Sequence, residues 1–369
     1  MSKIKLPHAS GNSMSIAAPA TNPSGDLELK LPATIGSAGQ VLKNSDTAGT
    51  LEFGPLLKSG RNVLINSNFA INQRGSFTAN QGEYTIDRWY HNTSGATSTI
   101  TQETHTVGSE IEGQEKYLKQ SVSTGNNYCC IRYRHEDVKT ITPGTWTVSF
   151  WAKGTTPPGG LQFWCDQDFG TGGSADVNIA QQTITALTGS WVRQSFNITV
   201  PSFSGKTINA ASYFQFAIGQ GSDGGTAAWE MNIANVQLEK GSQMTDYEPP
   251  RSYHDELLRC QRYYYNHVTD TGTQLAIANI VAYNSSTGYG TLYFPTTMRA
   301  HPSIDATSGG NYYIMHGDGG STYSNSVSLE TVGTNAVLIH VSGSYTAAGA
   351  YFARTNASAG GKVSFSAEL

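Results

Sequence analysis

Apolar and polar residues alternate along most of this chain, and clusters of Gly, Pro, Asn and Ser separate the alternating runs. Successive side chains of a strand point to opposite faces, so this alternation predicts strands that are buried on one face. The clearest pair of runs spans residues 145–151 and 161–166, with a Gly- and Pro-rich loop between them, and predicts a β-hairpin. The side chains predicted to face the core are Trp146, Val148, Phe150, Leu161, Phe163 and Cys165.

Further strands are predicted between residues 61 and 250. They lie around Ile131 and at residues 63–69, 191–200, 212–218 and 230–238. Repeated short strands between turn clusters are typical of two packed antiparallel sheets. Residues 61–250 are therefore predicted to form a central jelly-roll β-sandwich.

Residues 1–60 differ from the rest because they contain almost no aromatic residues. Two short pieces, residues 27–31 and 39–43, alternate between apolar and polar positions but are too few to close a core. A segment of this kind usually completes its apolar face on a partner chain. We expect an extended N-terminal arm that attaches or oligomerises the protein.

A short helical signal lies at residues 251–265, where Ser252 is placed to cap a helix and two acids follow in its first turn. This segment is predicted to be a linker helix. Alternation returns in residues 266–369, for example at 290–294, 336–341 and 362–365, and predicts a smaller C-terminal β-sandwich. The predicted fold class is all-β.

Composition supports this prediction and excludes several kinds of partner. Charged residues make up 14% of the chain and glycine 40 of its 369 residues, so Ser, Thr, Asn, Gln and Gly must form much of the surface. The net charge of −4, with no run of basic residues, argues against a nucleic-acid partner. No apolar stretch is long enough for membrane insertion. The four cysteines have no metal or disulfide spacing, so buried thiols formed in a host cytoplasm are expected.

Three segments resemble bacteriophage tail-fibre and related virion fibre proteins, notably those of marine and cyanobacterial phages. The first segment, residues 29–43, contains Leu-Lys-Leu-Pro and Gly-Gln-Val-Leu-Lys. The second opens with Asn-Val-Leu-Ile-Asn-Ser-Asn-Phe at 62–69 and closes with Asn-Val-Gln-Leu-Glu-Lys-Gly at 235–241. The third is Glu-Leu-Leu-Arg-Cys-Gln-Arg-Tyr-Tyr at 256–264. The resemblance implies a homotrimer in the virion. It implies that residues 1–60 contact other tail or adaptor proteins and that the distal β domains contact a host surface glycan or receptor.

The opening and closing runs also resemble those of carbohydrate-binding modules, in which a structural calcium commonly lies between the first and last strands. Those modules tend to have acids at the positions that are Ala70 and Asn235 in this chain. Calcium needs about six or more oxygen ligands, so the loss of both carboxylates argues against a tight site. We expect no metal and no cofactor.

Aromatic residues on the outer face of a strand suit sugar binding, because flat rings pack on the apolar faces of pyranoses and neighbouring polar groups bind the hydroxyls. Parity along the strands gives six glycan-binding candidates: Trp151, Trp164, Tyr213, Gln162, Asp166 and Gln215. The alternative is that Trp151 and Trp164 pair across the predicted hairpin, or are covered by a loop or a neighbouring subunit.

Catalytic patterns are scarce. A glycosidase needs two carboxyl groups on one face. Asp166 and Asp168 meet this condition because they are two residues apart. Glu136 and Asp137 do not meet it if both lie in a regular strand, because adjacent side chains point to opposite faces. The chain contains no Ser elbow motif, no paired-His zinc motif and no phosphate loop. We therefore expect that the chain is not an enzyme.

Two segments of the C-terminal region mix Tyr with Ser, Gly and Asn, a composition that recognition loops favour. Their receptor-loop candidates are Asn311, Tyr312, Tyr313, His316, Asp318 and Tyr323. The leading hypothesis is a structural tail-fibre protein that mediates host attachment. A capsid decoration or head-fibre protein without a receptor role and a polysaccharide depolymerase of the tail are the alternatives.

Overall fold

The computed structural model describes residues 3–7, 13–17, 28–36, 40–45, 50–55, 60–75, 77–79, 82–106, 108, 111, 115–124, 128–221, 225–250, 252–269, 272–317, 320–357 and 360–369. These residues form strands with one α-helix and one turn of 3₁₀-helix, so the all-β prediction is confirmed. Among them, no helix is both long and apolar enough to cross a membrane. The chain divides into two compact units, Met1–Ser59 and Gly60–Leu369.

The N-terminal unit contains two short antiparallel strand pairs. Strand β1 (Lys3–Pro7) pairs with β2 (Ser13–Ala17), and β3 (Gln40–Asn44) pairs with β4 (Leu51–Pro55). Several of its large apolar side chains are exposed, with Ile35 at 95% and Leu31 at 73%. The described residues of this unit thus leave several apolar side chains uncovered.

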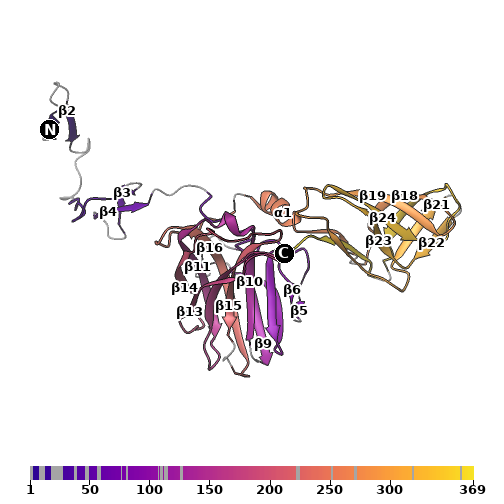
Figure 1. Cartoon of the computed structure of the whole chain (residues 1–369), viewed down its shortest axis with the longest axis horizontal. Helices are drawn as coiled ribbons and strands as arrows, with labels where there is room; N and C mark the ends of the chain where they lie inside the picture. Colours follow the sequence, from indigo (N-terminus) through magenta and orange to yellow (C-terminus); the bar gives the residue numbers. More distant parts are fainter. Residues whose placement is uncertain are drawn as a thin grey trace. The chain divides into compact units, whose positions relative to one another are not determined.

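The second unit begins with a sandwich of two antiparallel sheets (Figure 1). In order across the sheet, the front sheet contains β13 (Val177–Thr183), β12 (Gln162–Asp168), β15 (Tyr213–Gln220), β10 (Tyr128–Glu136), β7 (Trp89–Ser94) and β6 (Glu83–Tyr84). The rear sheet contains β14 (Val192–Val200), β11 (Gly144–Thr155), β16 (Trp229–Lys240), β9 (Lys116–Thr124), β8 (Thr97–Thr104) and β5 (Phe77–Ala79). The 3₁₀ turn η1 (Val138–Thr140) follows β10.

One apolar core lies between these sheets, and the predicted inward side chains belong to it. Phe163 of the front sheet stacks on Phe196 of the rear sheet with ring centroids 4.7 Å apart. Trp89 contacts Tyr133 edge to face at 5.1 Å, and its indole nitrogen donates to the carbonyl of Asn66. Parity along the strands therefore identifies the core face correctly for both β11 and β12.

The predicted hairpin of residues 145–166 is wrong. Strand β11 pairs with β14 and β16, whereas β12 pairs with β13 and β15, so the connection between them crosses from the rear sheet to the front sheet. Both strands bury one face in the same core, and alternation alone does not distinguish two strands that pair from two strands that face each other.

The strand predicted at residues 63–69 does not form. Asn66 and Phe69 have positive φ values of 54° and 58°, which breaks the extended backbone. This segment instead runs beside β16, where the Asn62 amide donates to the carbonyl of Val236 and its oxygen accepts from the backbone of Leu238. Backbone hydrogen bonds from Val63 to the Leu238 carbonyl at 3.2 Å and from Val236 to the Ser67 carbonyl at 2.9 Å add to these side-chain bonds, but no continuous strand ladder forms.

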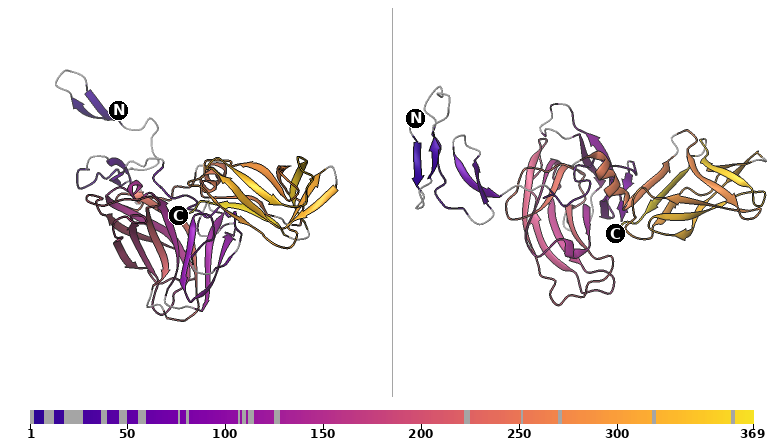
Figure 2. Two further views of the ribbon diagram at one scale, coloured as in Figure 1. Left: turned by 45° about the vertical axis from the view of Figure 1, so that its right-hand side comes forward. Right: turned by 90° about the horizontal axis from the view of Figure 1, so that it is seen from above.

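Helix α1 (Tyr253–Gln261) follows the first sandwich. The Ser252 hydroxyl accepts from the backbone N–H of Asp255 at 3.0 Å and caps the helix, as predicted. The helix is shorter than the sequence suggests, because Tyr264 already begins a strand. The right view in Figure 2 shows α1 beside the start of the second sandwich.

The second sandwich pairs a small sheet with a large one. The small sheet contains β17 (Tyr264–Thr269), β26 (Lys362–Ser366) and β20 (Ser303–Ala306). The large sheet contains β22 (Gly320–Ser324), β21 (Tyr313–Gly317), β25 (Ala350–Thr355), β18 (Ala276–Ala282), β19 (Thr287–Tyr293), β24 (Ala336–Ser342) and β23 (Val327–Val332). Their shared core includes Phe365, Ile339 and Met315, all fully buried.

The two sandwiches contact each other through buried charges. Glu368, just after β26, accepts hydrogen bonds from Arg74 at 3.0 Å and from Arg88, whose side chain is 1% exposed. The Arg88 guanidinium also lies 3.5 Å from the ring centre of Tyr263. The tyrosines after α1 therefore pack between the sandwiches.

Candidate functional site

The outer face of the front sheet is hollow at its centre. On β12 the side chains of Phe163 and Cys165 enter the core, so Gln162, Trp164 and Asp166 point outward. Strand β15 places only the small residue Ala217 opposite Trp164, and Arg132 of β10 lies opposite Ala217 on the far side. A small side chain between two large ones leaves a depression across the middle of the sheet.

Gly219 extends this depression along β15. Its φ of +152° favours glycine, and a Cβ atom at this position would lie 2.4 Å from the carbonyl oxygen of Cys129. No other residue fits here without displacing the backbone of β10. The floor of the depression is therefore fixed by the packing of two neighbouring strands.

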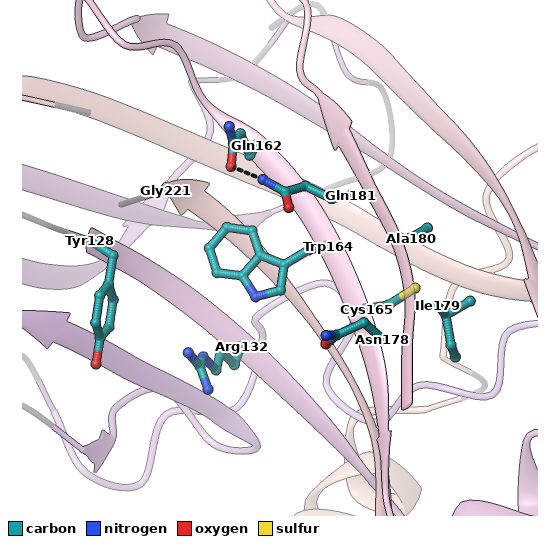
Figure 3. A pocket seen from close by; sticks show the side chains of 10 residues that line it. All are labelled: Tyr128, Arg132, Gln162, Trp164, Cys165, Asn178, Ile179, Ala180, Gln181 and Gly221. Atoms are coloured by element: carbon teal, nitrogen blue, oxygen red, sulfur yellow. Dashed lines mark hydrogen bonds between the residues drawn. The ribbon is translucent and has the colours of Figure 1, made fainter. Parts of the chain in front are cut away.

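A pocket of about 520 Å³ occupies this position. Figure 3 shows the Trp164 indole in the middle of it, with Tyr128 and Arg132 of β10 on one side and Asn178 and Gln181 of β13 on the other. The Gln181 amide donates to the Gln162 side-chain oxygen at 2.7 Å. The pocket thus combines a half-buried indole, a phenol, amides and a guanidinium, which are the groups that bind hydroxyl-rich, flat-faced ligands.

A second polar group lies on the same face, beside the pocket. The Gln215 amide donates to both oxygens of Asp166, at 3.0 and 3.2 Å, and its oxygen accepts from Arg134 at 3.3 Å. Arg134 also lies 4.8 Å from the ring centre of Tyr213. Burial raises the pKa of Asp166, while the bond from Gln215 and the charge of Arg132 oppose that rise. Burial likewise raises the pKa of Tyr213.

The structure brings most of the glycan-binding candidates together on this face: Trp164, Gln162, Asp166, Gln215 and Tyr213. Trp151 does not join them. It lies on the outer face of the rear sheet, where it packs against Trp191, Ile111 and Ala234. The alternative in which Trp151 and Trp164 pair across a hairpin is also wrong, because their strands belong to different sheets.

Sequence reasoning missed the residues that complete the pocket: Tyr128, Arg132, Asn178 and Gln181. Part of the signal was available, because residues 128–136 alternate and parity places Arg132 and Arg134 on one face. Their position near Trp164 depends on β15 lying between β12 and β10, although β15 follows both in the chain. Alternation within a strand carries no information on strand order.

The receptor-loop candidates are dispersed in the second sandwich. Asn311 is exposed and Tyr323 is 54% exposed on the edge strand β22. Tyr312 is partly buried against the core, and His316 accepts or donates a hydrogen bond with the Ser321 hydroxyl at 2.6 Å. Asp318 lies outside the described residues.

Tyr313 is not a surface residue. Its side chain is fully buried, and its hydroxyl donates to the carbonyls of Thr307 and Lys362, at 2.8 and 2.7 Å. The segment that looks like a loop in the sequence is strand β21, paired with β22 and β25. The exposed aromatics that the sequence reasoning missed lie elsewhere on this sandwich, with Tyr283 at 73% and Tyr293 at 76%.

The two positions that tend to have acids in calcium-holding modules carry no carboxylate in this chain, because they are Ala70 and Asn235. The Gln102 amide donates to the carbonyl oxygens of Phe69 and Ala70, at 2.6 and 3.2 Å, so these oxygens already have a donor. Asn235, at the other position, presents a neutral side chain. Within the described residues, no group of three or more His, Cys, Asp or Glu side chains is placed to hold a metal ion.

The acid pairs are engaged within the protein. Both carboxylate oxygens of Glu136 accept from Arg262, at 3.0 and 3.2 Å, and one also accepts from the Tyr263 hydroxyl at 2.6 Å. Asp168 accepts from the backbone N–H of Gly170 at 2.8 Å. Glu136 therefore helps to join the two sandwiches, and Asp168 stabilises the turn after β12.

Comparison with solved structures gives matches of low sequence identity and low TM-score. No family model matches the chain, and no curated protein matches it. A solved CBM4 structure is 18% identical over 47% of this chain and 97% of that chain, with a TM-score of 0.30. The family 11 carbohydrate-binding module of a Clostridium thermocellum cellulase is 12% identical over 46% of this chain and 99% of the module, with a TM-score of 0.30.

A tailspike is also among the similar structures. The enzymatically active domain of tailspike protein 4 from bacteriophage CBA120 is 13% identical over 51% of this chain, with a TM-score of 0.31. The match spans 22% of that tailspike chain.

Proposed function

We propose that this protein binds glycans through the front sheet and serves as a structural attachment component of a phage tail fibre. The observation that carries the glycan-binding part is the pocket around Trp164. The indole and the Tyr128 ring offer apolar surface to the faces of sugar rings, and the amides of Gln162, Gln181 and Asn178 offer donors and acceptors to the hydroxyls. The open sheet face admits a chain as well as a single sugar.

The fibre part of the proposal is supported by the N-terminal unit. Its strands β3 and β4 expose Val41 and Leu42, and the preceding segment exposes Leu31 and Ile35. Apolar side chains that a single chain leaves uncovered are buried when copies or partners assemble. We therefore propose a homotrimer, assembled in the host cytoplasm, whose residues 1–60 join tail or adaptor proteins and whose β domains reach a host surface glycan.

The glycan-binding proposal is tested with a pair of tryptophan variants on opposite sheets. The full chain is screened on an array of bacterial surface glycans, and the best oligosaccharide is titrated calorimetrically against wild type, W164A and W151A. We expect W164A to weaken binding at least about tenfold, because it removes the stacking surface, whereas W151A binds as wild type. Equal loss in both variants, or no loss in W164A, contradicts the proposal.

The protein is proposed to bind its glycan without cleaving it. Asp166 shares both oxygens with Gln215, and Asp168 caps a turn, so neither carboxyl is held ready for acid–base chemistry. Overnight incubation with the bound polysaccharide is expected to release no new reducing ends. Release that D166N abolishes would instead identify a depolymerase.

Assembly and location are tested separately from binding. Light scattering of the full chain is expected to give the mass of a trimer, and a chain starting at Gly60 is expected to dissociate if the N-terminal unit holds the copies together. Immunogold labelling of virions is expected to mark the tail. Gold on the head would contradict the tail-fibre role and favour a head fibre.

A further inference from the structure

Among the described residues that line the Trp164 pocket, Arg132 is the only one with a charged side chain. The other polar side chains in that lining are the Tyr128 phenol, the Cys165 thiol and the amides of Gln162, Asn178 and Gln181, and no carboxylate of the described residues lines the pocket. Arg132 projects from β10 between Ala217 of β15 and Tyr90 of β7. The pocket therefore presents one positive charge to whatever enters it.

Asp166 is the acid of this face whose charge acts on Arg132, but its carboxylate is hydrogen-bonded to another side chain. Asp166 accepts both amide hydrogen bonds of Gln215, and the oxygen of Gln215 accepts from Arg134. Gln215 thus links the carboxylate to a different arginine. Arg134 donates further to the carbonyl of Leu369 at 2.7 Å, which holds it at the other end of the face.

The Cys130 side chain interacts with Arg132, which still has unused hydrogen-bonding capacity at its Nε atom. Among the described residues, no carboxylate lies within ion-pair distance of it, and its buried Nε–H has no acceptor. A buried donor without a partner costs about 1–3 kcal/mol, so an acceptor supplied by a ligand would be favoured. A guanidinium presents a planar fork of N–H groups that matches a carboxylate in a bidentate manner.

We infer that the pocket selects acidic glycans, with Arg132 binding the carboxylate of a hexuronate while Trp164 stacks on its ring. This inference rests on the proposed glycan-binding function and names the substrate class for the same site. A sulfate ester would offer similar charge, but the planar fork favours the planar carboxylate. In Figure 3 the guanidinium of Arg132 lies next to the indole, so one sugar reaches both groups.

The test compares one oligosaccharide in two charge states. Trigalacturonate and its fully methyl-esterified form share a backbone and differ in their carboxylate charge. Calorimetric titration of the full chain is expected to give at least about tenfold tighter binding of the acid form, with an affinity that falls as salt rises. Equal affinity for both forms would overturn the inference.

Two substitutions assign the preference to Arg132. R132Q is expected to remove the preference for the acid form. R132K keeps the positive charge but loses the planar pair of N–H donors, so it is expected to retain only part of that preference. R354Q is the matched control, because it removes one positive charge from β25 of the second sandwich and is expected to leave the preference unchanged. A preference that survives in folded R132Q and R132K would also overturn the inference.

The outcomes separate this inference from the function on which it rests. If both forms bind equally and W164A abolishes both, the glycan-binding function stands and the acidic specificity fails. If neither form binds and no glycan on the array is retained, the function itself fails. If a sulfated trisaccharide competes and trigalacturonate does not, the carboxylate assignment is wrong.

Discussion

At the scale of single residues, the pocket depends on small residues at its floor as well as on large residues at its sides. Ala217 and Gly219 keep the centre of the front sheet low, and Trp164 and Arg132 rise on its two sides. Gly219 has a second constraint, because β15 and β10 approach so closely that its Cβ would overlap the backbone of Cys129. The depression is thus set by backbone packing that few substitutions tolerate.

Replacing Gly219 by Ala is expected to destabilise the protein by about 2–4 kcal/mol, since it adds a backbone clash to an unfavourable φ. G241A is the matched control, because Gly241 also has a positive φ of 129° but nothing lies within 4 Å of the added Cβ. We expect about 1 kcal/mol for the control. Urea unfolding measures both, and equal losses would show that the close approach of β15 and β10 does not matter.

His135 gives the first sandwich a pH-dependent stability. Burial and the charge of Arg88 lower the pKa of His135 from 6.5 to about 4. The unfolded chain therefore binds this proton at a higher pH than the folded chain, and stability falls as the pH drops from 6.5 towards 4. The contribution is on the order of 3 kcal/mol. The difference in unfolding free energy between pH 7 and pH 4 should shrink in H135Q; an unchanged difference would contradict a buried neutral histidine.

At the scale of elements, alternation predicted which face of each strand is buried but not which strand it pairs with. The core positions Val148 and Phe163 were identified correctly, yet their strands lie in opposite sheets. The same limit applies to the pocket. Parity along β12 predicted that Trp164 faces outward, but it did not predict that Tyr128 lies nearby, because β15 lies between the strands of the two residues. Trp151 was assigned to the wrong surface for this reason as well. Strand order depends on long-range pairing, which a local pattern does not encode.

Residues 63–69 are a second element that the local pattern misjudged. The pattern predicted a strand, but the segment is held by two backbone hydrogen bonds to β16 and by side-chain amides, including that of Gln102 from β8, which donates to the carbonyls of Phe69 and Ala70. We therefore expect a chelator such as EDTA, or added calcium, to leave the midpoint of thermal unfolding unchanged. Q102A should lower the midpoint, because buried carbonyls lose their donor. A fall on chelation in wild type would show that a metal binds after all.

At the scale of the whole molecule, the two sandwiches of the second unit are joined by buried ion pairs. Glu368 is 6% exposed and contacts Arg88 and Arg74, both of the first sandwich. Arg299 of the second sandwich donates to the backbone carbonyl of Glu368 at 2.7 Å and holds it in place. Removal of the Glu368 carboxylate is therefore expected to weaken the contact between the two sandwiches.

E368A is expected to cost about 3–5 kcal/mol, because it leaves Arg88 buried without its carboxylate. D305A is the control: it breaks the pair between Asp305 and Lys362, whose side chains are 53% and 32% exposed, and should cost no more than about 1 kcal/mol. Calorimetry of thermal unfolding measures both. A loss in E368A no larger than in D305A would mean that the sandwiches do not depend on this contact.

The central claim is that the outer face of the front sheet holds a glycan. It is tested most directly by a crystal structure of the full chain soaked with the oligosaccharide that binds best. The account predicts a sugar ring stacked on Trp164 within reach of Arg132 and Gln181. Sugar density confined to the rear sheet near Trp151, or to the second sandwich near Tyr283, would contradict it.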